Sequence, residues 1–207
     1  PGMDVKWKVL KEENISEVNG NVKLLKHESG LEVVGVNNQD KNKVFAISFA
    51  TPVTDSTGVA HILEHLVLNG SKKYPSKEPF TQLLKGSLKT FLNAFTYSDK
   101  TIYPVASEND QDFMNLMSVY LDAVFKPLLR EKAFAQEGWR HTWEKEEMKF
   151  KGVVFNEMKG ATNNPDWVMW WTSIKSLFPN SNYAHESGGL PLEIVNLSYE
   201  QLKEFHR

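Results

Sequence analysis

The sequence predicts an α+β fold in which a mainly antiparallel sheet packs against helices. Two pairs of apolar runs, each split by a short polar turn, are typical of β-hairpins. Segments with apolar residues at helical spacing fill most of the chain after residue 110. The chain has 207 residues, 41% of them hydrophobic, which is enough to bury a core and excludes intrinsic disorder as its main state.

The expected strands lie in the first half of the chain. Residues 28–30 (Glu-Ser-Gly) form a turn signal between the first two runs, and residues 98–100 (Ser-Asp-Lys) separate the last two. β-branched and aromatic side chains, which suit a pleated surface, are enriched on both sides of the second turn. The expected strands are 22–27, 31–36, 43–50, 90–96 and 101–106.

The expected helices are bounded by residues that commonly start or stop them. Asn69 and Gly70 end the first helix, Pro79 suits the first turn of the second, and Ser198 caps the last. The Trp-rich run 167–171 is interpreted as core or as a surface that contacts another domain. The expected helices are 57–68, 80–85, 110–125, 130–139, 152–161, 166–178 and 198–205.

Charge and cysteine content exclude several classes of function. Lys and Arg number 24 and Asp and Glu number 26, so no nucleic acid or membrane partner is expected. The absence of Cys excludes disulfides, cysteine metal sites and a thiol nucleophile. No apolar stretch approaches the ~18–20 residues of a membrane span, and no secretory signal opens the chain. We expect a cytoplasmic location, with the mitochondrial matrix or another organelle, after removal of a presequence, as the alternative.

One motif carries chemistry: His61, Glu64 and His65, in the order H-x-x-E-H. On a helix the three side chains fall within an arc of about 100°, opposite an apolar face. Two His at i and i+4 can bind one metal ion, and the carboxylate between them can take a proton from water and later give it to a leaving amine. The plainer interpretation, two His and a Glu on an ordinary helix, would leave several buried polar groups without partners.

A catalytic zinc site needs a third protein ligand, because it keeps three protein ligands and one open position. No further His follows the motif closely. Among the downstream carboxylates, Glu157 has the best setting, since apolar residues flank it on a short expected helix. From composition alone Glu157 is only the best of several downstream carboxylates, and Glu137 is the second candidate.

The motif and its surroundings resemble a known family. H-x-x-E-H is the thermolysin-type order reversed and marks the inverzincins. Six further blocks are similar, in collinear order, to the presequence protease branch of the pitrilysin (insulinase) zinc metallopeptidases. The blocks are 51–58, 84–88, 91–96, 103–107, 136–139 and 152–160.

The resemblance implies a site and a substrate. Zn²⁺ would be held by His61, His65 and Glu157, with Glu64 as the general base. A peptide would lie as an added strand along 91–96, and Asn93 and Ala94 are carried over as substrate contacts. The implied activity is zinc-dependent endopeptidase cleavage of short unfolded peptides, such as cleaved targeting peptides.

This chain departs from the family in length, because family members are several times longer. Pro1 and Gly2 precede Met3 and are interpreted as an expression scar. Residues 3–207 are expected to form a single incomplete N-terminal catalytic domain that lacks its last strand, and its partners would be the remaining domains and the peptide. The chain alone is therefore expected to be inactive. The alternatives are a non-catalytic scaffold or partner subunit, and a different metal-dependent hydrolase.

Overall fold

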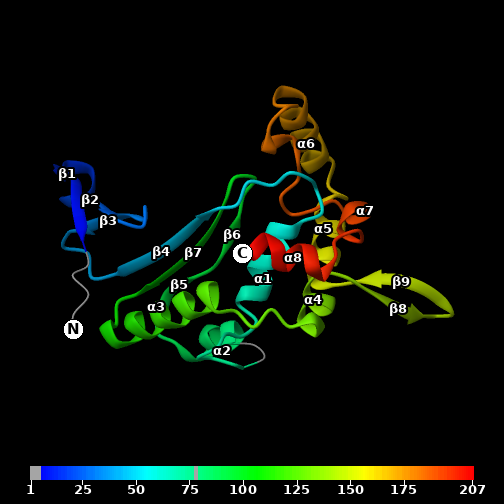
Figure 1. The fold of residues 1–207 in the computed structure, drawn as a ribbon, viewed down its shortest axis with the longest axis horizontal. Coiled ribbons are helices and arrows are strands. Elements are labelled where there is room, and N and C mark those ends of the chain that lie inside the picture. The colour runs from blue at the N-terminus through cyan, green and yellow to red at the C-terminus, as the bar shows by residue number, and fades with distance from the viewer. Residues whose placement is uncertain (1–5, 77–78) are drawn as a thin grey trace. The chain divides into compact units, whose positions relative to one another are not determined.

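The computed structural model describes residues 6–76 and 79–207, and its contacts divide the chain into two compact units, Pro1–Lys41 and Asn42–Arg207 (Figure 1). The structure has the predicted α+β character, with antiparallel sheets and helices. In the described parts of the chain, no helix is both long enough and apolar enough to cross a membrane.

The first unit is a three-stranded antiparallel sheet in the order β1-β2-β3. Two of its strands were expected, but β1 was not. In β1 the register shifts between Val9 and Lys11, and this bulge breaks the alternation of apolar and polar residues by which a strand is recognised. None of residues 6–41 is buried. The elements are β1 Trp7–Ile15, a 3₁₀ turn Ser16–Val18, β2 Gly20–His27 and β3 Glu32–Asn37.

The second unit contains a four-stranded antiparallel sheet in which β7 lies between β4 and β5, with the short β6 also paired to β7. Since β5 and β6 pair only with β7 among the described strands, they form one edge of this sheet. The strands are β4 Lys43–Ala50, β5 Lys89–Leu92, β6 Phe95–Thr96 and β7 Lys100–Ser107.

The expectation of one continuous strand over 90–96 is wrong at Asn93 and Ala94, which separate β5 from β6. Pro104 lies opposite on β7 and has no N–H to donate, so the ladder loses a hydrogen bond there. The Asn93 side chain instead accepts a bond from the Ala94 N–H (2.9 Å), which is a local alternative to strand pairing.

Helices cover this sheet and bury its core (Figure 1). α3 contacts β4 and β7, while α1 contacts α4, α8 and β6. Leu116 and Tyr120 of α3 and Ile62 and Leu66 of α1 are almost fully buried. The helices are α1 Val59–Val67, α2 Pro79–Gly86, α3 Asp110–Phe125, α4 Glu131–Glu137, α5 Val153–Ala161, α6 Pro165–Leu177, α7 Pro191–Ile194 and α8 Tyr199–His206, with a 3₁₀ turn at Asn182–Ala184.

The expected helix over 130–139 ends earlier, at Glu137, and a hairpin that was not expected follows it. Its strands are β8 Arg140–Glu144 and β9 Glu147–Lys151. Lys145 and Glu146 both have positive φ (49° and 65°), a conformation that Asn-Gly usually supplies in such turns. Without that signal, a run of charged residues is no sign of a turn.

The Trp-rich helix α6 forms as expected but contributes no buried residue. Trp170 is 56% exposed and Met169 is 66% exposed, so these two residues are not core, whereas Trp167 packs partly against the core. The other interpretation of the run, a surface that contacts another domain, stays a prediction. Trp167 and Trp171 stack on each other with ring centroids 5.8 Å apart.

Candidate metal centre

Helix α1 carries the motif and presents its polar side chains to one side. Ile62, Leu63 and Leu66 anchor the helix in the core, while His61, Glu64 and His65 are only partly buried. The helix begins after Gly58, which has a φ of +73°. A Cβ on Gly58 would lie 2.7 Å from the Gly188 carbonyl oxygen, so glycine at this point lets the 186–189 loop pack against the start of α1.

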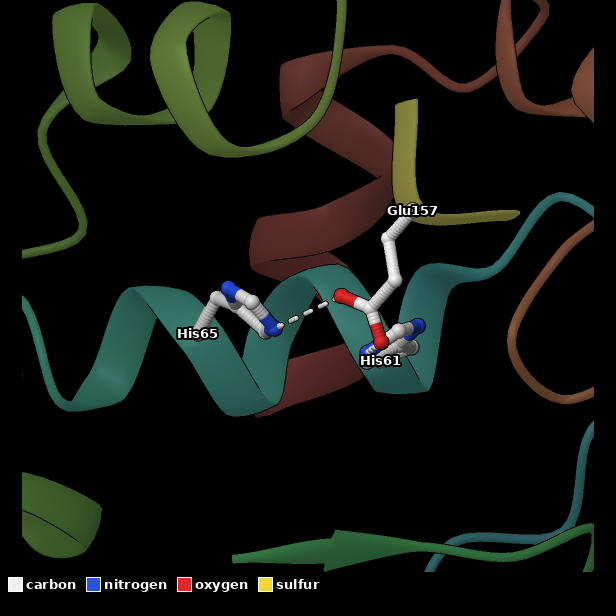
Figure 2. Close-up of side chains that lie close together, drawn as sticks. All are labelled: His61, His65 and Glu157. Carbon is white, nitrogen blue, oxygen red and sulfur yellow. Dashed lines mark ion pairs between the residues drawn. The ribbon is translucent and has the colours of Figure 1, made fainter. Parts of the chain in front are cut away.

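Helix α5 brings Glu157 to this side of α1. Val154, Phe155 and Met158 of α5 are buried and orient the helix. The Glu157 carboxylate reaches both imidazoles, with Oε1 at 3.8 Å from Nε2 of His61 and Oε2 at 3.9 Å from Nε2 of His65 (Figure 2). The structure thus joins three of the residues singled out from sequence, although 92 positions separate His65 from Glu157.

The donor set fits a divalent transition metal. One ligand atom from each of His61, His65 and Glu157 lies within 4.8 Å of the other two. Donors about 2.1 Å from a tetrahedral zinc ion lie roughly 3.4 Å apart, so small side-chain rotations would close the set. Two imidazole nitrogens and one carboxylate oxygen form a catalytic type of donor set, which leaves a fourth position free.

The outward nitrogens of both rings are held by hydrogen bonds. His61 Nδ1 lies 3.3 Å from the Gly188 carbonyl oxygen, and His65 Nδ1 lies 3.2 Å from Glu137 Oε2. Since a carbonyl and a carboxylate only accept, each Nδ1 donates, and the tautomer leaves Nε2 free to bind a metal. This arrangement is typical of metal-binding histidines.

Glu137, the second candidate for the third ligand, lies behind His65 rather than beside Glu157. It is 8% exposed and also accepts a bond from Asn69 Nδ2 (3.3 Å). Burial lowers the pKa of His65, but the hydrogen bond to Glu137 and the charges of the surrounding glutamates outweigh burial and raise the pKa above its ordinary value. The sequence offered Glu137 as the second candidate for the third metal ligand, and the structure places it instead on Nδ1 of His65.

Glu64 stands apart from the converging donors and contacts the sheet edge. Thr96 of β6 donates from Oγ1 to Glu64 Oε2 (2.5 Å), while Glu64 Oε1 has no hydrogen-bond partner among the residues that the structure describes. Thr96 was not among the residues singled out. A Thr in a run expected to form a strand is typical of β-structure, so its sequence context gave no sign of this contact.

Asn93 and Ala94 line two hollows that meet at the motif, each of about 390 Å³. Both hollows also include Glu64 and His65. The first is completed by residues 68 and 69, by α2 residues and by Glu137, and the second by His61, residues 95 and 96, Glu157 and residues 186–188. The expected substrate contacts therefore lie beside the candidate metal-binding set of His61, His65 and Glu157, at the break between β5 and β6.

Comparison with known proteins gives one family. The family model described as "Insulinase (Peptidase family M16)" matches residues 52–165. Presequence protease 1 of Arabidopsis thaliana, chloroplastic/mitochondrial, is 54% identical over 203 residues, which cover 96% of this chain and 19% of that protein. Protein HypA of Clostridium perfringens is 52% identical, covering 97% of this chain and 21% of that protein.

The fold is also similar to a crystal structure of pitrilysin, with a TM-score of 0.73 and 24% identity over 98% of this chain and 21% of that one. The chain spans about a fifth of the length of the curated relatives it matches.

Proposed function

The chain belongs to the insulinase family of peptidases (M16), and from that premise we propose that it is the zinc-binding part of a metalloendopeptidase acting on short unfolded peptides. One observation carries the proposal. The Glu157 carboxylate faces the Nε2 atoms of His61 and His65 while both Nδ1 atoms are engaged elsewhere. His61, His65 and Glu157 would hold the zinc ion.

Zinc bound there would supply a Lewis acid that polarises the scissile carbonyl and lowers the pKa of a water molecule. Glu64 is the general base in this proposal. Its Oε1 would accept a proton from the attacking water and later transfer it to the departing nitrogen. Thr96 holds the other carboxylate oxygen and thereby keeps Glu64 oriented toward the sheet edge.

The peptide would lie along the edge formed by β5 and β6. An edge strand offers unpaired main-chain groups, to which an extended peptide can add as a further strand. Asn93 and Ala94 would contact the peptide, because they line the hollows on both sides of Glu64. Main-chain recognition of this kind favours unfolded segments, and the names of the presequence proteases support cleaved targeting peptides as substrates.

The remaining domains of a longer protein would be the other partners of this part. Because the chain spans about a fifth of its relatives, we propose that residues 3–207 act as an N-terminal catalytic domain with little or no turnover alone. The compartment also stays a prediction. The relatives are named mitochondrial or chloroplastic, which favours an organelle as the location of this protein over the cytoplasm.

Metal content and turnover test the proposal together. Wild type and Glu64→Gln should each bind one zinc ion, measured by elemental analysis after dialysis, whereas His61→Ala and His65→Ala should lose it. Stoichiometric zinc in His61→Ala would contradict the site. A non-catalytic scaffold, the competing function, would need no bound zinc in the wild type. Robust cleavage of a fluorogenic peptide by the chain alone would disprove its dependence on further domains.

A further inference from the structure

The loop between the second 3₁₀ turn and α7 places another carboxylate in the hollow beside the metal-binding set. Glu186 lines the same 390 Å³ hollow as His61, Glu64 and Glu157. Its Oε1 accepts a hydrogen bond from the Gly188 N–H (3.1 Å), and the Gly188 carbonyl in turn accepts one from His61 Nδ1 (3.3 Å). A single residue therefore links the Glu186 carboxylate to the His61 ring.

The loop is held firmly enough to position this side chain. Ser56, which is 4% exposed, accepts at Oγ from the Glu186 N–H (3.1 Å) and at its carbonyl from the Leu190 N–H (2.8 Å). Gly189 packs against Gly58, and a Cβ on Gly189 would lie 2.9 Å from the Gly58 Cα. The loop is thus fastened at both ends to the segment that starts α1.

Charge distinguishes Glu186 from the other carboxylates in this hollow. Glu64 and Glu157 together would balance a divalent ion, which leaves the charge of Glu186 uncompensated. None of the side chains that line the hollow is Lys or Arg, and no ion pair of Glu186 occurs in the described ranges 6–76 and 79–207. Burial raises the pKa of Glu186, as expected for a carboxylate removed from water without a cation, although the bond from Gly188 opposes that rise.

We propose that Glu186 is a specificity-determining residue that receives the cationic side chain, Lys or Arg, of a peptide residue next to the scissile bond. This inference rests on the proposed function, because the same hollow must hold the peptide. The cation would pair with the carboxylate oxygens of Glu186, and a charge-assisted bond of that kind is about twice as strong as a neutral one. The subsite would favour basic over neutral side chains of the same shape.

Binding of matched peptides tests the inference without requiring turnover. The zinc-loaded chain carries Glu64→Gln to prevent cleavage. It is titrated into pairs of fluorescent, N-acetylated peptides, one with Arg and the other with citrulline at the same position. The substituted position is moved stepwise along the peptide from one pair to the next. At one position the Arg peptide should bind about tenfold more tightly than the citrulline peptide, as a charged hydrogen bond predicts. Adding Glu186→Gln should abolish that difference, because the amide keeps the bond from Gly188 but loses the charge.

Glu131→Gln, a change at an exposed carboxylate on α4, is the matched control and should leave the preference intact. Equal binding of Arg and citrulline peptides at every position would overturn the subsite while leaving the proposed function standing. If Glu186→Gln weakens the binding of the Arg and citrulline peptides equally, the subsite would also be overturned, because that result indicates only a structural role for Glu186. Failure of all peptides to bind the chain without the Glu186 change would contradict the proposed function itself, and the subsite with it.

Discussion

At the scale of single residues, Glu137 is the group that sets the tautomer and raises the pKa of His65. It is buried and bonds the nitrogen of His65 that faces away from Glu157. A carboxylate in that position fixes the tautomer and increases the basicity of a metal-binding imidazole. Because the pKa of His65 is raised, its proton competes with a metal ion, and zinc affinity should fall as the pH drops through that pKa.

Glu137→Gln should weaken zinc binding by about 10- to 100-fold, the usual effect of removing such a partner. The pH below which zinc affinity begins to fall should also move downward, since the charge that raises the pKa of His65 is gone. Competition with a zinc indicator across a pH series measures both effects. Glu131→Gln, on the same helix but exposed, is the control. Unchanged zinc affinity in Glu137→Gln would show that the contact with His65 has no influence on the metal.

At the scale of elements, a pair of glycines sets how closely α4 and α5 approach. Gly152 comes just before α5, and a Cβ there would lie 2.0 Å from the Gly138 carbonyl oxygen, just after α4. This close passage brings Glu137 of one helix and Glu157 of the other to opposite nitrogens of His65. The arrangement of the candidate site therefore depends on a backbone contact as well as on its side chains.

Gly152→Ala should destabilise the chain by about 1–3 kcal/mol, as overpacking does, because the added Cβ would meet backbone atoms of Gly138 and Trp139 rather than the end of a flexible side chain. It should also weaken zinc binding by displacing α5. Gly160→Ala is a matched control on the same helix. A Cβ there meets nothing within 4 Å, and Ala should stabilise the helix by roughly 0.5–1 kcal/mol. Denaturant unfolding measures both changes, and equal effects of the two substitutions would contradict this account.

At the scale of the whole molecule, two buried tyrosines link the core to the acidic site. Tyr103 of β7 and Tyr120 of α3 are at most 4% exposed. Burial, and then the nearby charge of Glu64, raise the pKa of both phenols well above the ordinary value. Tyr120 also donates a hydrogen bond to the Asn93 carbonyl (3.1 Å), so the core supports the break between β5 and β6.

Stability should therefore fall as the pH rises above about 10, where an unfolded tyrosine ionises and a folded one keeps its proton. Below that pH both states are neutral at these positions, and the phenols add no pH dependence. Each buried phenol contributes a slope of up to about 1.4 kcal/mol per pH unit. Thermal unfolding from pH 8 to 11 should show a shallower decline for Tyr103→Phe, with exposed Tyr97→Phe as the control. An identical slope for Tyr103→Phe and wild type would contradict this source of alkaline instability.

Much of the fold follows from local signals in the chain. The capping box at Ser198 and Gln201 starts α8 next to the expected position, and the apolar spacing of α1 and α3 places them within two residues. The errors occur where one local feature overrides the pattern. A bulge breaks the polar and apolar alternation of β1, so that strand was not predicted. The turn of the β8–β9 hairpin has positive φ at Lys145 and Glu146, which are not typical turn residues. Pro104 interrupts the ladder opposite Asn93, so the expected strand is divided there.

The sequence by itself determined which side chains share one face of α1, because the geometry of a single helix follows from residue spacing. It also ranked Glu157 first and Glu137 second among several downstream carboxylates for the third donor, without deciding between them. Only the tertiary structure decided that Glu157 faces the Nε2 atoms of His61 and His65 and that Glu137 lies behind His65. The reason is physical. The distance between side chains on different helices depends on how those helices pack, and this packing cannot be read from the spacing of residues along the chain.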